Sequence, residues 1–111
     1  MKDGETLSIL LLNEAGSWTA QCIEYDLAGQ GKTSDDALYD LQRVFCVFEM
    51  ASREEGIENA WEALPPAPEF YRKRFKGGPS VDVTPPRIQC DVEETAHRHA
   101  LAQNAEVRLG S

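Results

Sequence analysis

The longest regular hydrophobic pattern in the chain begins after Thr33 and constrains the fold most. Thr33 is a favoured helix N-cap residue, and Asp35 and Asp36 place negative charge at the positive end of a helix dipole. This pattern predicts a long helix that begins at about Ser34 and buries one face. The apolar residues recur with the i, i+3, i+4, i+7 spacing of a single face, at Ala37, Leu38, Leu41, Val44, Phe45, Phe48 and Ala51.

Three strand patterns precede this helix. Leu7–Leu12 is an apolar run, and turn-forming residues at 13–17 separate it from the loosely alternating segment Trp18–Tyr25. Asp26–Gly31 returns as a short third strand whose glycines permit a tight bend. We therefore predict an α+β fold in which a small antiparallel sheet, in the order β-β-β-α-β, packs against one long helix.

Two apolar surfaces exceed what this simple arrangement buries. Cys46, Val47 and Met50 widen the apolar arc of the helix, so part of it is expected to contact something besides its own sheet. Leu7–Leu12 has apolar residues on both faces, and one helix covers only one side of a sheet. Either the following segment or a second copy of the chain must cover the rest. We predict a homo-oligomer, a dimer or a dimer of dimers.

Proline content divides the chain. All six prolines lie between Pro65 and Pro86, beside Gly77 and Gly78. We expect an α+β domain over residues 1–78 and a proline-interrupted extension over 79–111, which ends in Ala105–Leu109 as an edge strand. Short helical turns are expected at 57–64 and 69–75, with Gly56 as a helix break.

Composition places the chain among cytoplasmic proteins of one domain. Its 111 residues are 41% apolar, and no apolar run approaches the roughly 18 residues that a membrane span needs. The first five residues do not resemble the basic start of a signal peptide. Cys22, Cys46 and Cys90 lie far apart without a CxxC motif, which favours thiols over a disulfide framework or a structural zinc site.

Charge is distributed unevenly. The net charge is -8; residues 1–64 hold 13 acidic and 4 basic residues, whereas residues 65–78 hold 4 basic and 1 acidic residue. An acidic body repels the nucleic acid backbone and attracts basic proteins. A general DNA- or RNA-binding role is therefore not expected unless the short basic segment serves it, DNA binding least of all, and a basic protein partner is expected.

The front of the chain resembles the HicB-like antitoxin family over residues 5–55. The resemblance rests on Gly16 and Trp18 entering the second strand, on the pair Asp26-Leu27 after it, and on a Gly-x-Thr-x-x-x-Ala-Leu helix entry at Gly31–Leu38. It implies a small fold similar to a reduced ribonuclease H domain without catalytic acids. Members of this family bind HicA, a small basic toxin that degrades mRNA. Such members also carry a C-terminal DNA-binding module, which residues 79–111 do not resemble.

Two functions follow from this resemblance. In the first, the chain is a non-enzymatic protein-binding module, an antitoxin that neutralises a small basic HicA-like toxin. In the second, it is a self-associating, stand-alone HicB-like protein with a structural role and no toxin partner. The residues expected to contact a partner are Trp18, Asp26, Asp35, Asp36, Arg72, Lys73 and Arg74.

No catalytic, cofactor or metal site is expected. Cys90, His97 and His99 do not match a common zinc-ligand spacing, and no nucleophile signature surrounds any serine or cysteine. Residues 70–76 interleave aromatic and basic side chains, as some RNA-binding segments do. The alternative is that the aromatics anchor a short helix to the body while the basic residues face solvent.

Overall fold

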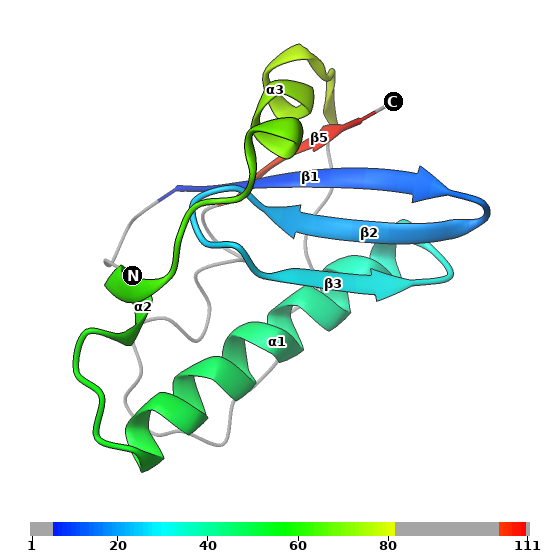
Figure 1. Cartoon of the computed structure of the whole chain (residues 1–111). Coiled ribbons are helices and arrows are strands. Elements are labelled where there is room, and N and C mark those ends of the chain that lie inside the picture. The colour runs from blue at the N-terminus through cyan, green and yellow to red at the C-terminus, as the bar shows by residue number, and fades with distance from the viewer. Residues whose placement is uncertain (1–5, 82–104, 111) are drawn as a thin grey trace.

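The computed structural model describes residues 6–81 and 105–110 and has an α+β fold (Figure 1). The strands are β1 (Leu7–Glu14), β2 (Ser17–Cys22), β3 (Ala28–Gly31), β4 (Ser80–Val81) and β5 (Ala105–Leu109). The helices are α1 (Ser34–Glu54), α2 (Ala60–Ala63) and α3 (Glu69–Gly77). The expected sheet and long helix are therefore present.

The sheet differs from the antiparallel one predicted. Its strand order is β3-β2-β1-β5-β4, and β5 runs parallel to β1, so the sheet is mixed. The prediction that Ala105–Leu109 forms an edge strand is wrong, because β5 lies between β1 and β4. The reason is that β1, the most apolar strand, is paired on both edges: Ile9 lies opposite Cys22 of β2 and opposite Val107 of β5.

The two faces of the sheet have different covers. Leu7, Ile9 and Leu11 point into the core that contains Leu38 and Leu41 of α1. On the opposite face, α3 lies over the sheet (Figure 1), and Leu10 and Leu12 of β1 are buried. Of the two covers that the sequence left open for this face, the following segment and a second copy of the chain, the segment after α1 covers it.

Backbone hydrogen bonds hold the proline-rich segment in place. Asp26 N donates to the Pro65 carbonyl at 2.9 Å, and Ala67 N donates to the Ile23 carbonyl at 2.9 Å. Arg108 of β5 then donates to the carbonyls of Phe75 and Lys76 at the end of α3, at 3.2 and 3.1 Å. These bonds fix α3 against the sheet although none of its residues is buried.

The start of α1 is the one predicted. Thr33 has an extended backbone, and its Oγ1 accepts a hydrogen bond from Asp36 N at 3.0 Å. Asp35 and Asp36 lie in the first turn, where negative charge stabilises the helix. Strand β3 packs so closely on α1 that a Cβ atom built on Gly29 would lie 2.6 Å from the Ala37 carbonyl oxygen.

Two further findings concern the cysteines and the helices. Cys22 is buried and forms no disulfide, but Cys46 is disulfide-bonded, so the expectation of thiols is wrong at Cys46. Among the described residues, no helix is both long and apolar enough to cross a bilayer.

The β1–β2 turn makes a first prediction. Ala15 and Gly16 link the paired residues Glu14 and Ser17, and their φ angles are +53° and +82°. Two positive φ angles are typical of a type I′ turn, which asparagine tolerates better than alanine. Ala15→Asn is therefore expected to raise the free energy of unfolding by about 0.5 to 1 kcal/mol in urea titrations. Ala15→Val should lower it, and equal effects of the two variants would contradict this account of the turn.

Candidate functional site

An apolar groove runs along the solvent side of α1. It consists of two hollows of about 400 and 310 Å³ that share Phe48 and Ala51. Besides these two, the first hollow is lined by Leu27, Asp40, Arg43, Val44 and Val47, and the second by Ser52, Glu55, Ile57, Ala60, Ala63 and Leu64. We call the two together the α1 groove.

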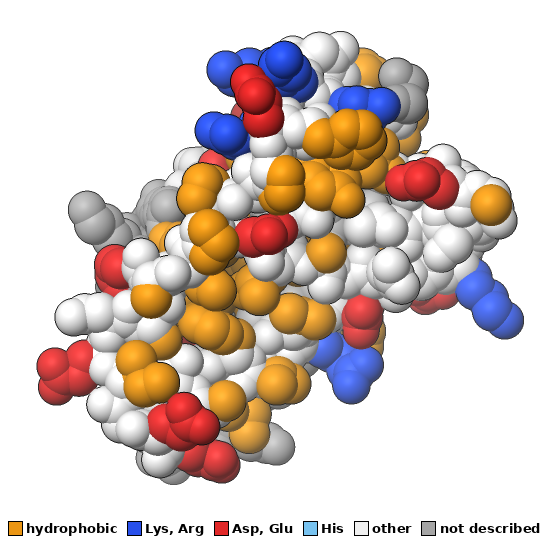
Figure 2. All heavy atoms as spheres, viewed as in Figure 1, with side chains coloured by type: hydrophobic (Ala, Val, Ile, Leu, Met, Phe, Trp, Pro, Cys, Tyr) orange, Lys and Arg blue, Asp and Glu red, His pale blue; other side chains and the backbone are white. Residues whose placement is uncertain are grey.

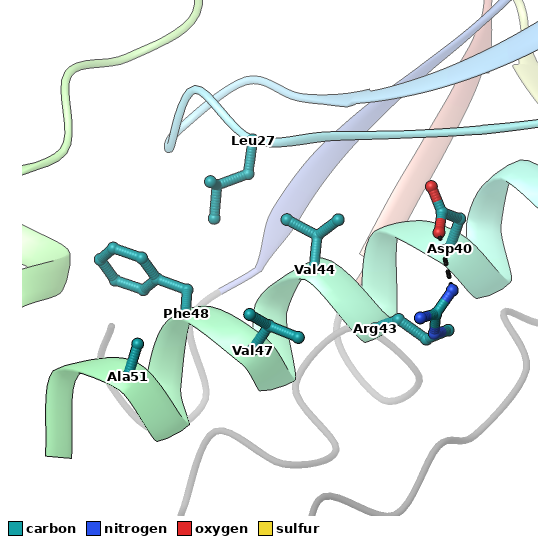
Figure 3. Close-up of a pocket in the computed structure, with 7 residues that line it drawn as sticks. All are labelled: Leu27, Asp40, Arg43, Val44, Val47, Phe48 and Ala51. Carbon is teal, nitrogen blue, oxygen red and sulfur yellow. Dashed lines mark hydrogen bonds and ion pairs between the residues drawn. The ribbon is translucent and has the colours of Figure 1, made fainter. Parts of the chain in front are cut away.

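The groove follows a second apolar stripe of the helix. Val44, Val47, Phe48 and Ala51 are spaced i, i+3, i+4, i+7, which places them on one face. In Figure 3, Leu27, which directly precedes β3, points down toward Val44 and Phe48, and Val47 and Ala51 lie beside them on α1. The Val47 side chain is 61% exposed. This stripe has the geometry of a helix-packing surface without a described partner element over Val47.

An aromatic cluster supports Phe48, which lines both hollows. The Trp61 ring lies 4.7 Å from the Phe48 ring and 5.3 Å from the Phe45 ring, centroid to centroid, both edge-on. Its Nε1 donates to Glu49 Oε1 at 2.8 Å. Trp61 is only 5% exposed, so it fixes α2 against α1 beneath Phe48, the aromatic residue that both hollows share.

Acidic side chains lie at both ends of the groove. At one end Asp40 accepts hydrogen bonds from Gln30 N at 2.9 Å and from Arg43 at 3.3 Å. At the other end Glu55 lines the second hollow, and Glu58 and Glu62 are exposed nearby in sequence. Figure 2 shows hydrophobic side chains gathered over this side of the molecule, with acidic side chains around their lower end.

Asp40 also covers part of the outer edge of the sheet. Strand β3 is an edge strand, and unpaired edge N–H groups invite pairing with other chains. Because Asp40 accepts the hydrogen bond of Gln30 N, that group is not available to an added strand. Within the part of the chain that the structure describes, the groove is therefore a more open surface for a partner than the β3 edge.

Three of the predicted contact residues lie at one end of the fold. Trp18 of β2 is half-buried against the core and pairs with Gly31, and a Cβ atom on Gly31 would contact Asp36. Asp35 and Asp36 are exposed in the first turn of α1. Trp18 thus acts mainly in packing, while the two aspartates present negative charge beside it.

The other four predicted residues lie elsewhere. Asp26 is in the β2–β3 connection, and its Oδ1 accepts a hydrogen bond from the buried Gln21 side chain at 3.0 Å. Arg72, Lys73 and Arg74 are on α3, across the sheet from α1 (Figure 1). The seven residues therefore do not form one continuous surface.

The sequence interpretation missed the α1 groove as a site. It assigned Val44, Phe48 and Ala51 to the core, whereas Val44 and Phe48 are half-buried and Ala51 is exposed. The signal that pointed to the groove was the widened apolar arc at Val47.

No group of three or more His, Cys, Asp or Glu side chains within the described ranges is arranged to hold a metal ion. Cys90, His97 and His99 lie outside those ranges.

Comparison with known proteins gives no family assignment. No protein-family model, curated protein or solved structure matches the chain.

Proposed function

We propose that this chain is a non-enzymatic protein-binding module that holds a small basic protein in the α1 groove. The observation that carries the proposal is the partly exposed stripe of Val44, Val47, Phe48 and Ala51, which continues into the second hollow. An apolar helix face of this kind receives an amphipathic helix of a partner in a common mode of recognition.

Charge supports a basic partner. Glu55 lies at one end of the groove, Asp40 at the other end is paired with Arg43, and residues 1–64 are strongly acidic. Opposite charge around an apolar contact accelerates association and selects the partner. Asp35 and Asp36 extend the acidic surface at the start of α1.

The resemblance to HicB-like proteins gives this partner a chemical class. A small basic toxin that degrades mRNA fits both the acidic rim and the apolar stripe, and the chain then acts as its antitoxin. The alternative is that a second copy of the chain occupies the groove, as a self-associating HicB-like protein without a toxin.

The α1 groove makes a second prediction. In purification from native cells, the wild-type chain is expected to retain a small basic protein in a stoichiometric complex. Val47→Arg should weaken that complex by about 30-fold or more, because it fills an apolar contact with charge. The affinities are measured by calorimetric titration of the purified partner.

Tyr39→Arg is the matched control. Tyr39 is exposed on the same helix but does not line the groove, so the added charge alone should change the affinity by less than about threefold. Equal losses in both variants would reject the groove as the binding surface. Recovery of the chain alone, in multiples, would instead support self-association, and a partner whose mRNA cleavage stops in the complex would support the antitoxin role.

A further inference from the structure

Helix α3 carries a basic and aromatic surface that the α1 groove does not explain. It holds four basic residues and one acidic residue, in a chain whose net charge is -8. Helix α3 lies on the face of the sheet opposite α1, and its basic side chains gather at the top of Figure 2. The surface is thus separate from the acidic rim of the groove.

The aromatic side chains of α3 do not anchor it in the core. No residue of α3 is buried, and the Phe70 ring is 51% exposed. The guanidinium carbon of Arg74 lies 3.8 Å from the centre of that ring, and the Tyr71 ring meets it edge-on at 5.0 Å. The Arg74 guanidinium therefore covers one face of the Phe70 ring, and the outer face of this stacked pair is a platform of the kind on which nucleobases stack.

A hollow lies next to this platform. It has a volume of about 310 Å³, between the end of α3 and the end of β5, and Arg74 is on its rim. Gly77, Gly78 and Gly110 supply much of the remaining lining, so backbone is approachable there. This volume is at the lower end of the range for small-molecule sites, which suits one nucleotide rather than a folded partner.

The other basic side chains of α3 are positioned to contact phosphates. Arg72 and Lys76 are exposed and one helical turn apart, and Lys73 is exposed beside them. The ion pair of Lys73 with Glu69, at 3.8 Å between two exposed side chains, holds that lysine only weakly.

From these observations we infer that α3 binds a short single strand of nucleic acid, with one base stacked on Phe70 and Arg74 and with phosphates on Arg72 and Lys76. An acidic protein segment would pair with the basic side chains of α3, but it would have no need of an aromatic platform beside a nucleotide-sized hollow. The acidic body limits the contact to α3, because it repels a longer strand or a duplex.

The test is fluorescence anisotropy with labelled 12-nucleotide oligo-uridine and oligo-deoxythymidine at low salt, using the full chain alone. Binding of either probe by the wild type is expected. Phe70→Ala should lower the affinity about tenfold, as expected for loss of one stacked base. Tyr39→Ala removes an equally exposed aromatic from α1 and should leave the affinity unchanged.

Salt dependence tests the phosphate contacts. The double variant Arg72→Gln with Lys76→Gln should reduce the slope of log affinity against log salt by about 1.4, since each phosphate contact on a single strand contributes about 0.7. Failure of both probes to bind, or equal affinities of Phe70→Ala and Tyr39→Ala, would overturn the inference. Binding of a labelled polyglutamate peptide in place of both probes would also overturn it and assign α3 to an acidic protein partner.

Discussion

Replacement of Trp61 by alanine is expected to lower the free energy of unfolding by about 3 to 5 kcal/mol. The side chain is 5% exposed, and its ring meets those of Tyr25, Phe45 and Phe48 edge-on at 4.7 to 5.3 Å. Alanine removes the common centre of these three contacts and leaves a cavity between α1 and α2. Chemical denaturation followed by circular dichroism measures the change.

A second variant separates packing from hydrogen bonding at Trp61. Trp61→Phe keeps an aromatic ring but cannot donate to Glu49 Oε1, so a smaller loss of about 1 to 2 kcal/mol is expected. If Trp61→Ala lost less than about 1 kcal/mol, the aromatic cluster would not be the element that holds α2 to α1.

A methyl group on Gly29 is expected to destabilise the fold by about 3 kcal/mol or more. A Cβ atom there would contact Leu41 N and would lie 2.6 Å from the Ala37 carbonyl oxygen and 2.8 Å from the Asp40 carbonyl carbon. All three atoms belong to the backbone of α1, so no side chain can rotate away. The helix must move off the sheet, which opens the core beneath Leu41.

Gly77→Ala is the matched control for Gly29→Ala. Gly77 is the last residue of α3, and a Cβ atom built on it has no atom within 4 Å. This variant should be neutral or stabilising by up to about 1 kcal/mol, because alanine favours the helix. The same urea titration applied to both variants distinguishes a local clash from a general cost of losing glycine. Similar destabilisation in both would contradict the close β3–α1 packing.

Local sequence signals account for the front half of the fold. The Thr33 cap, the acidic first turn and the apolar spacing after Ala37 each depend on residues within one or two helical turns. The structure confirms the cap and the acidic turn, and it buries most of the first part of the predicted face, through Phe45, but not Ala51. The strand–turn–strand pattern before them is equally local, since the Ala15-Gly16 turn determines the pairing of Glu14 with Ser17.

The arrangement of the later elements depends on contacts distant in sequence. Pairing of β5 with β1 joins Ala105 to Leu7, and no local pattern in either strand encodes a parallel neighbour. The same applies to α3, whose place on the second face depends on hydrogen bonds from Arg108 and on the path from Pro65. Sequence patterns therefore predicted that Leu10 and Leu12 are covered, but they did not show whether the following segment or a second copy of the chain covers them.

The candidate site was predictable only in its chemistry. Charge counts indicated the acidic body and the basic segment at 65–78, but they could not show that the sheet separates Asp35 of α1 from Arg72 of α3. The apolar arc at Val47 indicated an extra contact surface. Whether Phe48 belonged to the core or to that surface depended on the position of α2, which follows a turn at Gly56 with a φ of +69°.

Site-specific photocrosslinking tests the proposed role of the α1 groove most directly. Val47→benzoylphenylalanine places a photoreactive group within the groove, and Lys73→benzoylphenylalanine places the same group on α3, across the sheet. After irradiation of the complex isolated from native cells, we expect the first variant to crosslink to a small basic protein and the second not to do so. Crosslinks from position 73 but not from position 47 would contradict a partner in the α1 groove.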